Sequence, residues 1–222
     1  MILYPKSMTH RVDEIDLLRG VAIVCMVTFH WFMMLDMRYH SNYLANPTID
    51  LLGQVARALF VFLIGVSTAL SQQKAQLRED NNAEANGLRD ENDFLRRQFR
   101  RVGFLALYAV GITLVTMYLV PDRYVQFGIL HYMAVALTLL TLFAYKPRTV
   151  GPVVPVLVGM AMLVVYFNSK GKLSSNPFYK FVLGYRGYEG TIDIFPLFKW
   201  FWLSALGLLA GSLLYQKGQP RY

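Results

Sequence analysis

The sequence predicts an all-α membrane protein, a bundle of six transmembrane helices with both termini in the cytoplasm. Hydrophobic residues make up 55% of the 222 residues and charged residues only 16%, whereas a typical soluble domain is about one quarter charged. The apolar residues form six long blocks, each close to the roughly 20 residues that cross a bilayer core. The basic residues behind the net charge of +8 lie in short connections between these blocks. That placement is typical of membrane orientation and argues against a nucleic-acid partner.

The six expected helices cover residues 15–36, 49–72, 103–120, 125–145, 150–168 and 194–215. The first block is expected to span the membrane rather than to be a cleavable signal peptide, because its apolar run is too long and no small-residue cleavage site follows. We expect one domain over residues 1–222. Residues 73–98 would form a basic, polar cytoplasmic connection that partly extends the flanking helices. Residues 169–193, rich in glycine and aromatic residues, would form a loop at the outer mouth.

The distribution of basic residues gives the orientation. If the chain crosses six times, the N-terminal segment, the second and fourth connections and the C-terminus fall on one side, and all of them carry Lys or Arg. The positive-inside rule makes that side cytoplasmic. The fifth connection opposes this assignment, because it would lie outside and also carries basic residues: Lys170, Lys172, Lys180 and Arg186.

The first apolar block contains one charged and one titratable side chain, Arg19 and His30. Eleven positions on an α-helix bring them to within about 20° of the same face, roughly 16 Å apart along the axis. Ionisable groups at membrane depth usually face an interior and mark a functional path. Simpler interpretations stay open: Arg19, near Asp16, can anchor the helix at the interface, and His30 can be a neutral hydrogen-bonding residue between helices.

The second block places Asp50, Gln54 and Arg57 on one stripe, at i, i+4 and i+7. An arginine below the membrane surface needs a partner, which Asp50 or Asp193 could supply. A structural ion pair and an anion-binding role are equally compatible with this pattern. Farther along, Gly65 and Ser67 are small residues of the kind that allow close packing of helices.

Several titratable residues are predicted to lie in the outer half of the bundle: His30, His131, Asp193, Asp36 and His40. Two histidines near carboxylates are suited to act as a general base and its orienting group. A His/Asp metal site is the other interpretation, but no HxxH or HExxH spacing supports one, so we expect no metal. No nucleophile elbow, phosphate-binding glycine loop or CxxC pair is present, and Cys25 is the single cysteine.

Four segments carry a family pattern: RVDEIDLLRGVAIVCMVTFH at residues 11–30, FVFLIGVS at 60–67, FGILH at 127–131, and IDIFPLFKW with LGLLAG within 192–211. In this order they resemble the bacterial heparan-α-glucosaminide N-acetyltransferase-like membrane proteins of the transmembrane acyltransferase superfamily. The Arg-x10-His spacing is similar to that of the wider superfamily.

The resemblance implies transfer of an acyl group, in the first place acetyl, from cytoplasmic acyl-CoA to a glycan hydroxyl or amine at the outer face. Arg19 would help to hold the donor, and we place Asp16 and Arg57 in the same donor-binding group. His30 would lie beside the acyl group. His40 falls within a residue of the acetyl-accepting histidine of the sugar acetyltransferases, which makes it a second candidate. The implied location is the inner (cytoplasmic) membrane of a bacterium.

The chain also departs from the family pattern. Tyr132 follows His131 where the sugar acetyltransferases tend to carry arginine, and Lys199 replaces the second proline of the pattern PLFPW. Six helices are fewer than the ten or so of full acyltransferases, so a second copy or other membrane subunits could complete the site. The alternative function is a non-catalytic subunit of a larger membrane complex that keeps the acyltransferase-like fold. A transporter is disfavoured because no internal duplication is visible.

Overall fold

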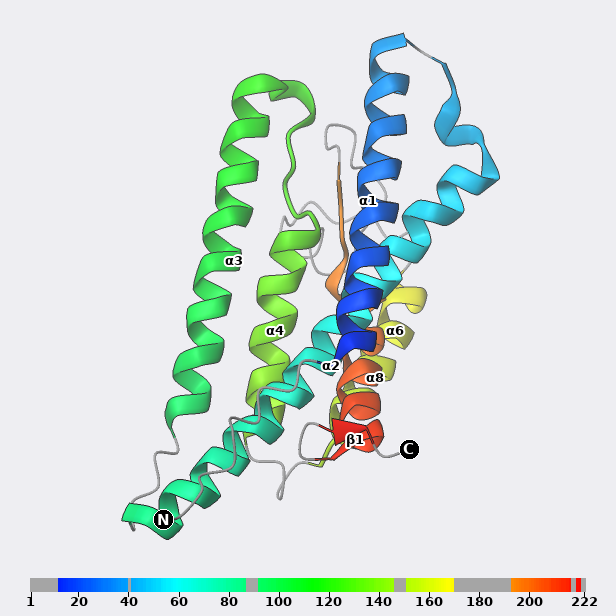
Figure 1. Cartoon of the computed structure of the whole chain (residues 1–222). Coiled ribbons are helices and arrows are strands. Elements are labelled where there is room, and N and C mark those ends of the chain that lie inside the picture. Colours follow the sequence, from blue (N-terminus) through cyan, green and yellow to red (C-terminus); the bar gives the residue numbers. More distant parts are fainter. Residues whose placement is uncertain are drawn as a thin grey trace.

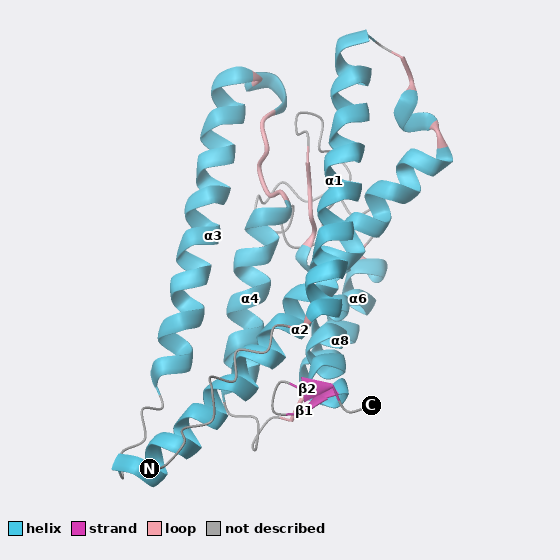
Figure 2. Cartoon of the chain, viewed as in Figure 1, coloured by secondary structure: helices cyan, strands magenta, loops and turns pink. Residues whose placement is uncertain are grey.

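The computed structural model describes residues 12–39, 41–86, 92–145, 151–169, 193–216 and 219–220. Within these ranges the chain is almost entirely helical (Figures 1 and 2). The six α-helices are α1 (Asp13–Tyr39), α2 (Pro47–Asn86), α3 (Asn92–Leu119), α4 (Ile129–Tyr145), α6 (Val153–Asn168) and α8 (Leu197–Leu214). Two short 3-10 helices, η1 (Tyr43–Ala45) and η2 (Pro121–Arg123), lie in the connections after α1 and α3. Each predicted apolar block therefore corresponds to one helix.

Two strands of two residues each, β1 (Tyr215–Gln216) and β2 (Gln219–Pro220), pair antiparallel after α8. β1 begins at Tyr215, the last residue of the sixth apolar block, and β2 lies beyond that block. The prediction of an all-α protein is otherwise confirmed over the described residues.

Four helices are long and apolar enough to cross a membrane: α1, Pro47–Leu77 within α2, Phe94–Leu119 within α3, and α8. The other two, α4 and α6, are apolar but have only 17 and 16 residues. At 1.5 Å per residue they rise about 25 Å, slightly less than the roughly 30 Å of a bilayer core.

The centre of the fold is the packing of α2 against α8, with α6 and α4 on either side. Glycines set the close approach of the two central helices. A Cβ on Gly65 would collide with the backbone of Ser204, and one on Gly207 would collide with the carbonyl of Phe62. The expectation that Gly65 serves close helix packing is confirmed. Ser67 points elsewhere, as described below.

A buried hydrogen-bond chain joins three helices of this core. Ser204 on α8 donates to the Val61 carbonyl on α2 at 3.0 Å, and Tyr132 on α4 donates to the Ser204 hydroxyl at 2.6 Å. All three residues are fully buried. Tyr132, which departs from the family pattern, thus has a structural role in this chain.

Helices α1 and α3 lie at the periphery. α1 packs on α2, α3 packs on α4, and neither is extensively paired with the other. Figure 1 shows them standing apart. Both expose much of their apolar surface, as a protein bounded by lipid does.

Several helix boundaries differ from the prediction. α3 begins at Asn92 rather than near residue 103, and α2 continues to Asn86. The polar connection 73–98 is thus largely helical over its described residues, because its Glu, Gln, Lys and Arg are good helix formers that carry both helices beyond their apolar parts. α4 begins at Ile129 rather than 125. Of the loop 169–193, only Ser169 and Asp193 are described.

Candidate functional site

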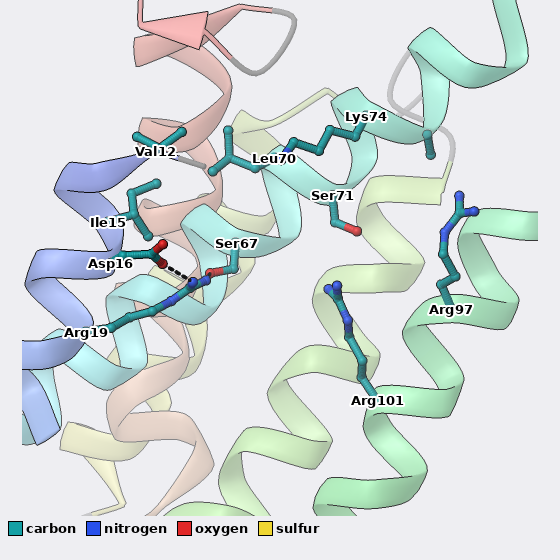
Figure 3. A pocket seen from close by; sticks show the side chains of 11 residues that line it. Val12, Ile15, Asp16, Arg19, Ser67, Leu70, Ser71, Lys74, Arg97 and Arg101 are labelled. Atoms are coloured by element: carbon teal, nitrogen blue, oxygen red, sulfur yellow. Dashed lines mark hydrogen bonds and ion pairs between the residues drawn. The ribbon is translucent and has the colours of Figure 1, made fainter. Parts of the chain in front are cut away.

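Two cavities lie along α1. Residues of α1, α2 and α3 line both of them, and the second is also lined by residues of α4 and of the segment before α8. The cavity near the start of α1, the cationic cavity, has a volume of about 640 Å³. Figure 3 shows its polar lining, which comes from three helices: Asp16 and Arg19 on α1, Ser67, Ser71 and Lys74 on α2, and Arg97 and Arg101 on α3. The cavity beside the second half of α1, the histidine cavity, has about 540 Å³ and includes His30, Arg57, His131 and Asp193.

Arg19 is fixed in the cationic cavity by two partners. Its Nη1 lies 2.9 Å from Oδ1 of Asp16, and its Nη2 donates to the Ser67 hydroxyl at 2.5 Å. The pairing of Asp16 with Arg19 is the one that their spacing allows. Ser67 therefore lies on the opposite face of α2 from Gly65 and holds Arg19 rather than packing on α8.

The side chains that line the cationic cavity carry a net positive charge. Four cationic side chains line it, Arg19, Lys74, Arg97 and Arg101, against one lining carboxylate, Asp16. Such a concentration of guanidinium and ammonium groups at a partly enclosed site favours an anion, and phosphate in particular. The contributions of α2 and α3 to this cavity were not predicted from the sequence. The spacing of these residues could have indicated the site. On a helix, Ser67, Ser71 and Lys74 lie on one face of α2, and Arg97 and Arg101, at i and i+4, lie on one face of α3.

In the histidine cavity, one ring nitrogen of His30 is hydrogen-bonded to the backbone of its own helix. Nδ1 lies 2.8 Å from the carbonyl oxygen of Met26, four residues earlier on α1. A carbonyl only accepts, so in the neutral ring Nδ1 carries the proton and Nε2 keeps its lone pair. His30 is thereby set up to accept a proton through Nε2.

In His131 it is the other ring nitrogen, Nε2, that is hydrogen-bonded. Thr113 on α3 donates its hydroxyl proton to the Val125 carbonyl at 2.9 Å, so it accepts at its oxygen from Nε2 of His131 at 3.3 Å. Nδ1 of His131 then keeps the lone pair. This atom is buried and has no hydrogen-bond partner among the described residues.

Asp193 reaches the same cavity because two loop segments run side by side. Phe127 and Ile194 form an isolated parallel bridge, with the Phe195 N–H donating to the Phe127 carbonyl at 2.9 Å. Asp193 Oδ2 accepts the Ile129 N–H at 3.2 Å, at the positive end of α4. A Cβ on Gly128 would lie 2.8 Å from this oxygen. The bridge between Phe127 and Ile194 and the hydrogen bond to Asp193 are the reason that α4 starts later than predicted.

Burial raises the pKa of the Asp193 carboxyl above its ordinary value. The Ile129 N–H, Arg57 and the two histidines act against that rise. Asp193 therefore interacts electrostatically with both imidazoles of the cavity that all three residues line.

Arg57 belongs to the histidine cavity rather than to the group around Arg19. Its Nε donates to the Gly53 carbonyl at 3.0 Å, and its Cζ lies 5.8 Å from the centroid of the Phe29 ring. Its electrostatic partner is Asp193. Asp50, the other proposed partner, instead accepts from the Gln54 amide at 2.7 Å.

The remaining predicted residues lie elsewhere. The Asp36 carboxylate accepts the backbone N–H groups of Tyr43 and Leu44, the latter at 2.8 Å, and so holds the turn after α1. It lines neither of the two cavities. His40 is outside the described residues. Within the described ranges, no cluster of three or more His, Cys, Asp or Glu suited to a metal ion occurs.

The chain matches a known protein family. The family description is heparan-alpha-glucosaminide N-acetyltransferase, catalytic, and the match runs over residues 11–222, which includes both cavities. The chain belongs to this family. With four helices long and apolar enough to span a bilayer, it is an integral membrane protein of an acetyltransferase family. No curated protein and no solved structure shows a significant match to the chain.

Proposed function

We propose that this protein transfers an acyl group, acetyl in the first place, from acyl-CoA to a hydroxyl or amine of a glycan-bearing acceptor. One observation carries the proposal: a cationic cavity and a histidine cavity lie along α1, and α2 and α3 contribute to the lining of both. Family membership supports the reaction class and acetyl-CoA as the donor.

The cationic cavity suits the nucleotide end of the donor. Coenzyme A carries several phosphate charges at one end and its thioester at the other. Lys74, Arg97 and Arg101 would bind phosphate oxygens, and Arg19 would do so while held by Asp16 and Ser67. Because positions 19 and 30 are about 16 Å apart along α1, the extended arm of the donor would have to run along α1 towards His30.

The histidine cavity suits the transfer step. Nε2 of His30 accepts the proton of the acceptor hydroxyl or amine while the oxygen or nitrogen attacks the thioester carbonyl. The new acyl–O or acyl–N bond forms, the acyl–S bond breaks, and the imidazolium returns the proton to the leaving thiolate, which gives the coenzyme A thiol. Arg57 would stabilise negative charge on the carbonyl oxygen, and His131 with Asp193 would assist the proton transfer.

The orientation belongs to the same proposal. Six crossings with both termini in the cytoplasm place the cationic cavity on the cytoplasmic side, where acyl-CoA is made, and the histidine cavity towards the outer face. The basic residues of the second connection support that side, because Lys and Arg are retained in cytoplasmic loops. In a bacterium this membrane would be the inner one.

The test is to purify the chain gently and measure what it binds. Coenzyme A or acetyl-CoA is expected to raise the unfolding temperature in a concentration-dependent manner, and acetyl-CoA with an acceptor is expected to release free thiol. Co-purification of stoichiometric partner proteins with no protection by coenzyme A would overturn the proposal and favour the non-catalytic subunit.

A further inference from the structure

The histidine cavity has an incomplete wall between α1 and α3. Its lining includes Met26, Met33 and Met37 on α1, and Ala109 and Ile112 on α3. These two helices pack on α2 and α4 respectively and are not extensively paired with each other. Two apolar lining side chains are at the same time exposed, Met37 at 56% and Ile112 at 43%, and His30 is exposed as well. Within the described part of the chain, the cavity therefore opens sideways along a seam between α1 and α3.

The seam lies at the depth of the bilayer core. Met26 is the middle residue of α1, 13 residues from either end of Asp13–Tyr39, and the cavity extends from there towards Met37 and Leu44. Over the same stretch both helices expose apolar side chains, among them Val27, Met34 and Val115. An opening at this depth meets hydrocarbon rather than water.

The lining chemistry indicates what can occupy the cavity. Most of the wall is apolar, and the α1 side carries three methionines, which adapt their shape to irregular apolar partners. The titratable groups are confined to His30, Arg57, His131 and Asp193. A free sugar would leave most of its hydroxyls without partners against such walls, at a cost for each one. A molecule with one reactive polar group on a hydrocarbon chain fits both parts of the cavity.

We infer that the acceptor of this enzyme is lipid-tailed and enters sideways from the bilayer, with its chain in the seam between α1 and α3 and its hydroxyl or amine beside His30 and His131. This inference rests on the proposed acyl transfer and adds the class of acceptor and its route. A second copy of the chain, or another membrane protein, covering the seam is the competing occupant.

The first experiment does not require activity. The full chain in phospholipid nanodiscs is photolabelled with a phospholipid that carries a diazirine on its acyl chain, and the labelled residues are mapped by mass spectrometry. Met26, Met33 and Ile112 are expected to be labelled, and dodecyl glucosaminide, but not methyl glucosaminide, should reduce this labelling. Leu107, an exposed side chain of α3 outside the cavity lining, is the control that should be labelled throughout.

Labelling of Leu107 with none at Met26 and Met33 would overturn the inference, because protein would then cover the seam. Labelling of all sites without competition by the dodecyl compound would also overturn it, because the seam would then admit bulk lipid but no acceptor.

The second experiment compares acceptors and a seam variant. Acetyl transfer from acetyl-CoA to dodecyl glucosaminide should exceed transfer to methyl glucosaminide by at least roughly tenfold in kcat/KM. Met33→Trp, which fills the seam, should remove most of that preference, whereas Met34→Trp, on the adjacent exposed position outside the cavity, should keep it.

Equal transfer to both acceptors would refute the lipid-tailed acceptor while leaving the acyltransferase intact. Absence of coenzyme A binding and of thiol release would instead refute the proposed function, and the photolabelling would still decide whether hydrocarbon occupies the seam.

Discussion

At the residue scale, the two imidazoles of the histidine cavity present different nitrogens. His30 is held through Nδ1 by its own helix, and His131 through Nε2 by Thr113 of a neighbouring helix. In each neutral ring, therefore, one nitrogen donates a hydrogen bond to the protein and the other keeps a lone pair that can accept a proton. The sequence indicates the position of His30 but not its tautomer, because the deciding Met26 carbonyl is a backbone group. The role of Thr113 could not be predicted, because that threonine lies on a different helix from His131.

Replacing His30 tests the base assignment. We expect His30→Ala to lower kcat for acyl transfer by about 10²–10⁴-fold, with an unchanged unfolding temperature and unchanged coenzyme A binding. Thr28→Ala is the matched control, because Thr28 lies two positions earlier on α1, donates to the Val24 carbonyl, and lines neither cavity. An acyl-CoA-dependent His30→Ala enzyme with normal kcat would reject the role.

Thr113 is a positioning residue, and its test is a pH profile. Thr113→Val removes the oxygen that accepts from Nε2 of His131, so the ring loses the partner that fixes its tautomer. We expect a lower kcat and a displaced pH profile of kcat/KM, with Thr113→Ser restoring both. A loss of activity with an unchanged pH profile, and no rescue by serine, would indicate that Thr113 acts only in packing.

At the element scale, composition and hydropathy were enough to find the six helices that the structure describes, because apolar blocks of membrane length give a strong signal. They could not reveal which helices pack together. The α2–α8 interface depends on Gly65 meeting Gly207 and Ser204, residues about 140 positions apart. Nor could they locate the start of α4, which depends on Asp193 and on the bridge between Phe127 and Ile194.

The α2–α8 contact is expected to be sensitive to a single methyl group. Gly65→Ala places a Cβ against the backbone of Ser204, so the helices must separate or the backbone must shift, which typically costs about 1–3 kcal/mol. Thermal unfolding in one detergent should show a clear loss of stability. Gly103→Ala on α3, where a Cβ meets nothing within 4 Å, should cause no loss of stability. Equal behaviour of the two variants would contradict the close approach of α2 and α8.

At the scale of the whole molecule, the proposal assigns donor binding to the cationic cavity and acyl transfer to the histidine cavity. Changes in the cationic cavity should therefore act on KM and changes in the histidine cavity on kcat. We expect Arg97→Gln with Arg101→Gln to raise KM for acetyl-CoA and to weaken protection by coenzyme A, with little change in kcat. Arg96→Gln with Arg100→Gln, on the same helix but outside the cavity lining, is the control. A fall in kcat at unchanged KM would contradict this division.

The proposed orientation places the two cavities towards opposite membrane surfaces. In a Cys25→Ser background, Gln76→Cys, beyond the cationic cavity on α2, should react with an impermeant thiol reagent only from the cytoplasmic side. Ser41→Cys, after α1, should react only from the outer side. Both positions are exposed. Reaction of both cysteines from the same side would contradict the proposed crossing of α1 and α2.

The central claim is that one donor molecule lies along α1, with its phosphates in the cationic cavity and its thioester end at the histidine cavity. A cryo-EM structure of the full chain with coenzyme A tests it most directly. The account predicts phosphate density among Arg19, Lys74, Arg97 and Arg101, and a thiol end pointing towards His30. Phosphates bound away from these four side chains, or a thiol end directed away from His30, would contradict it.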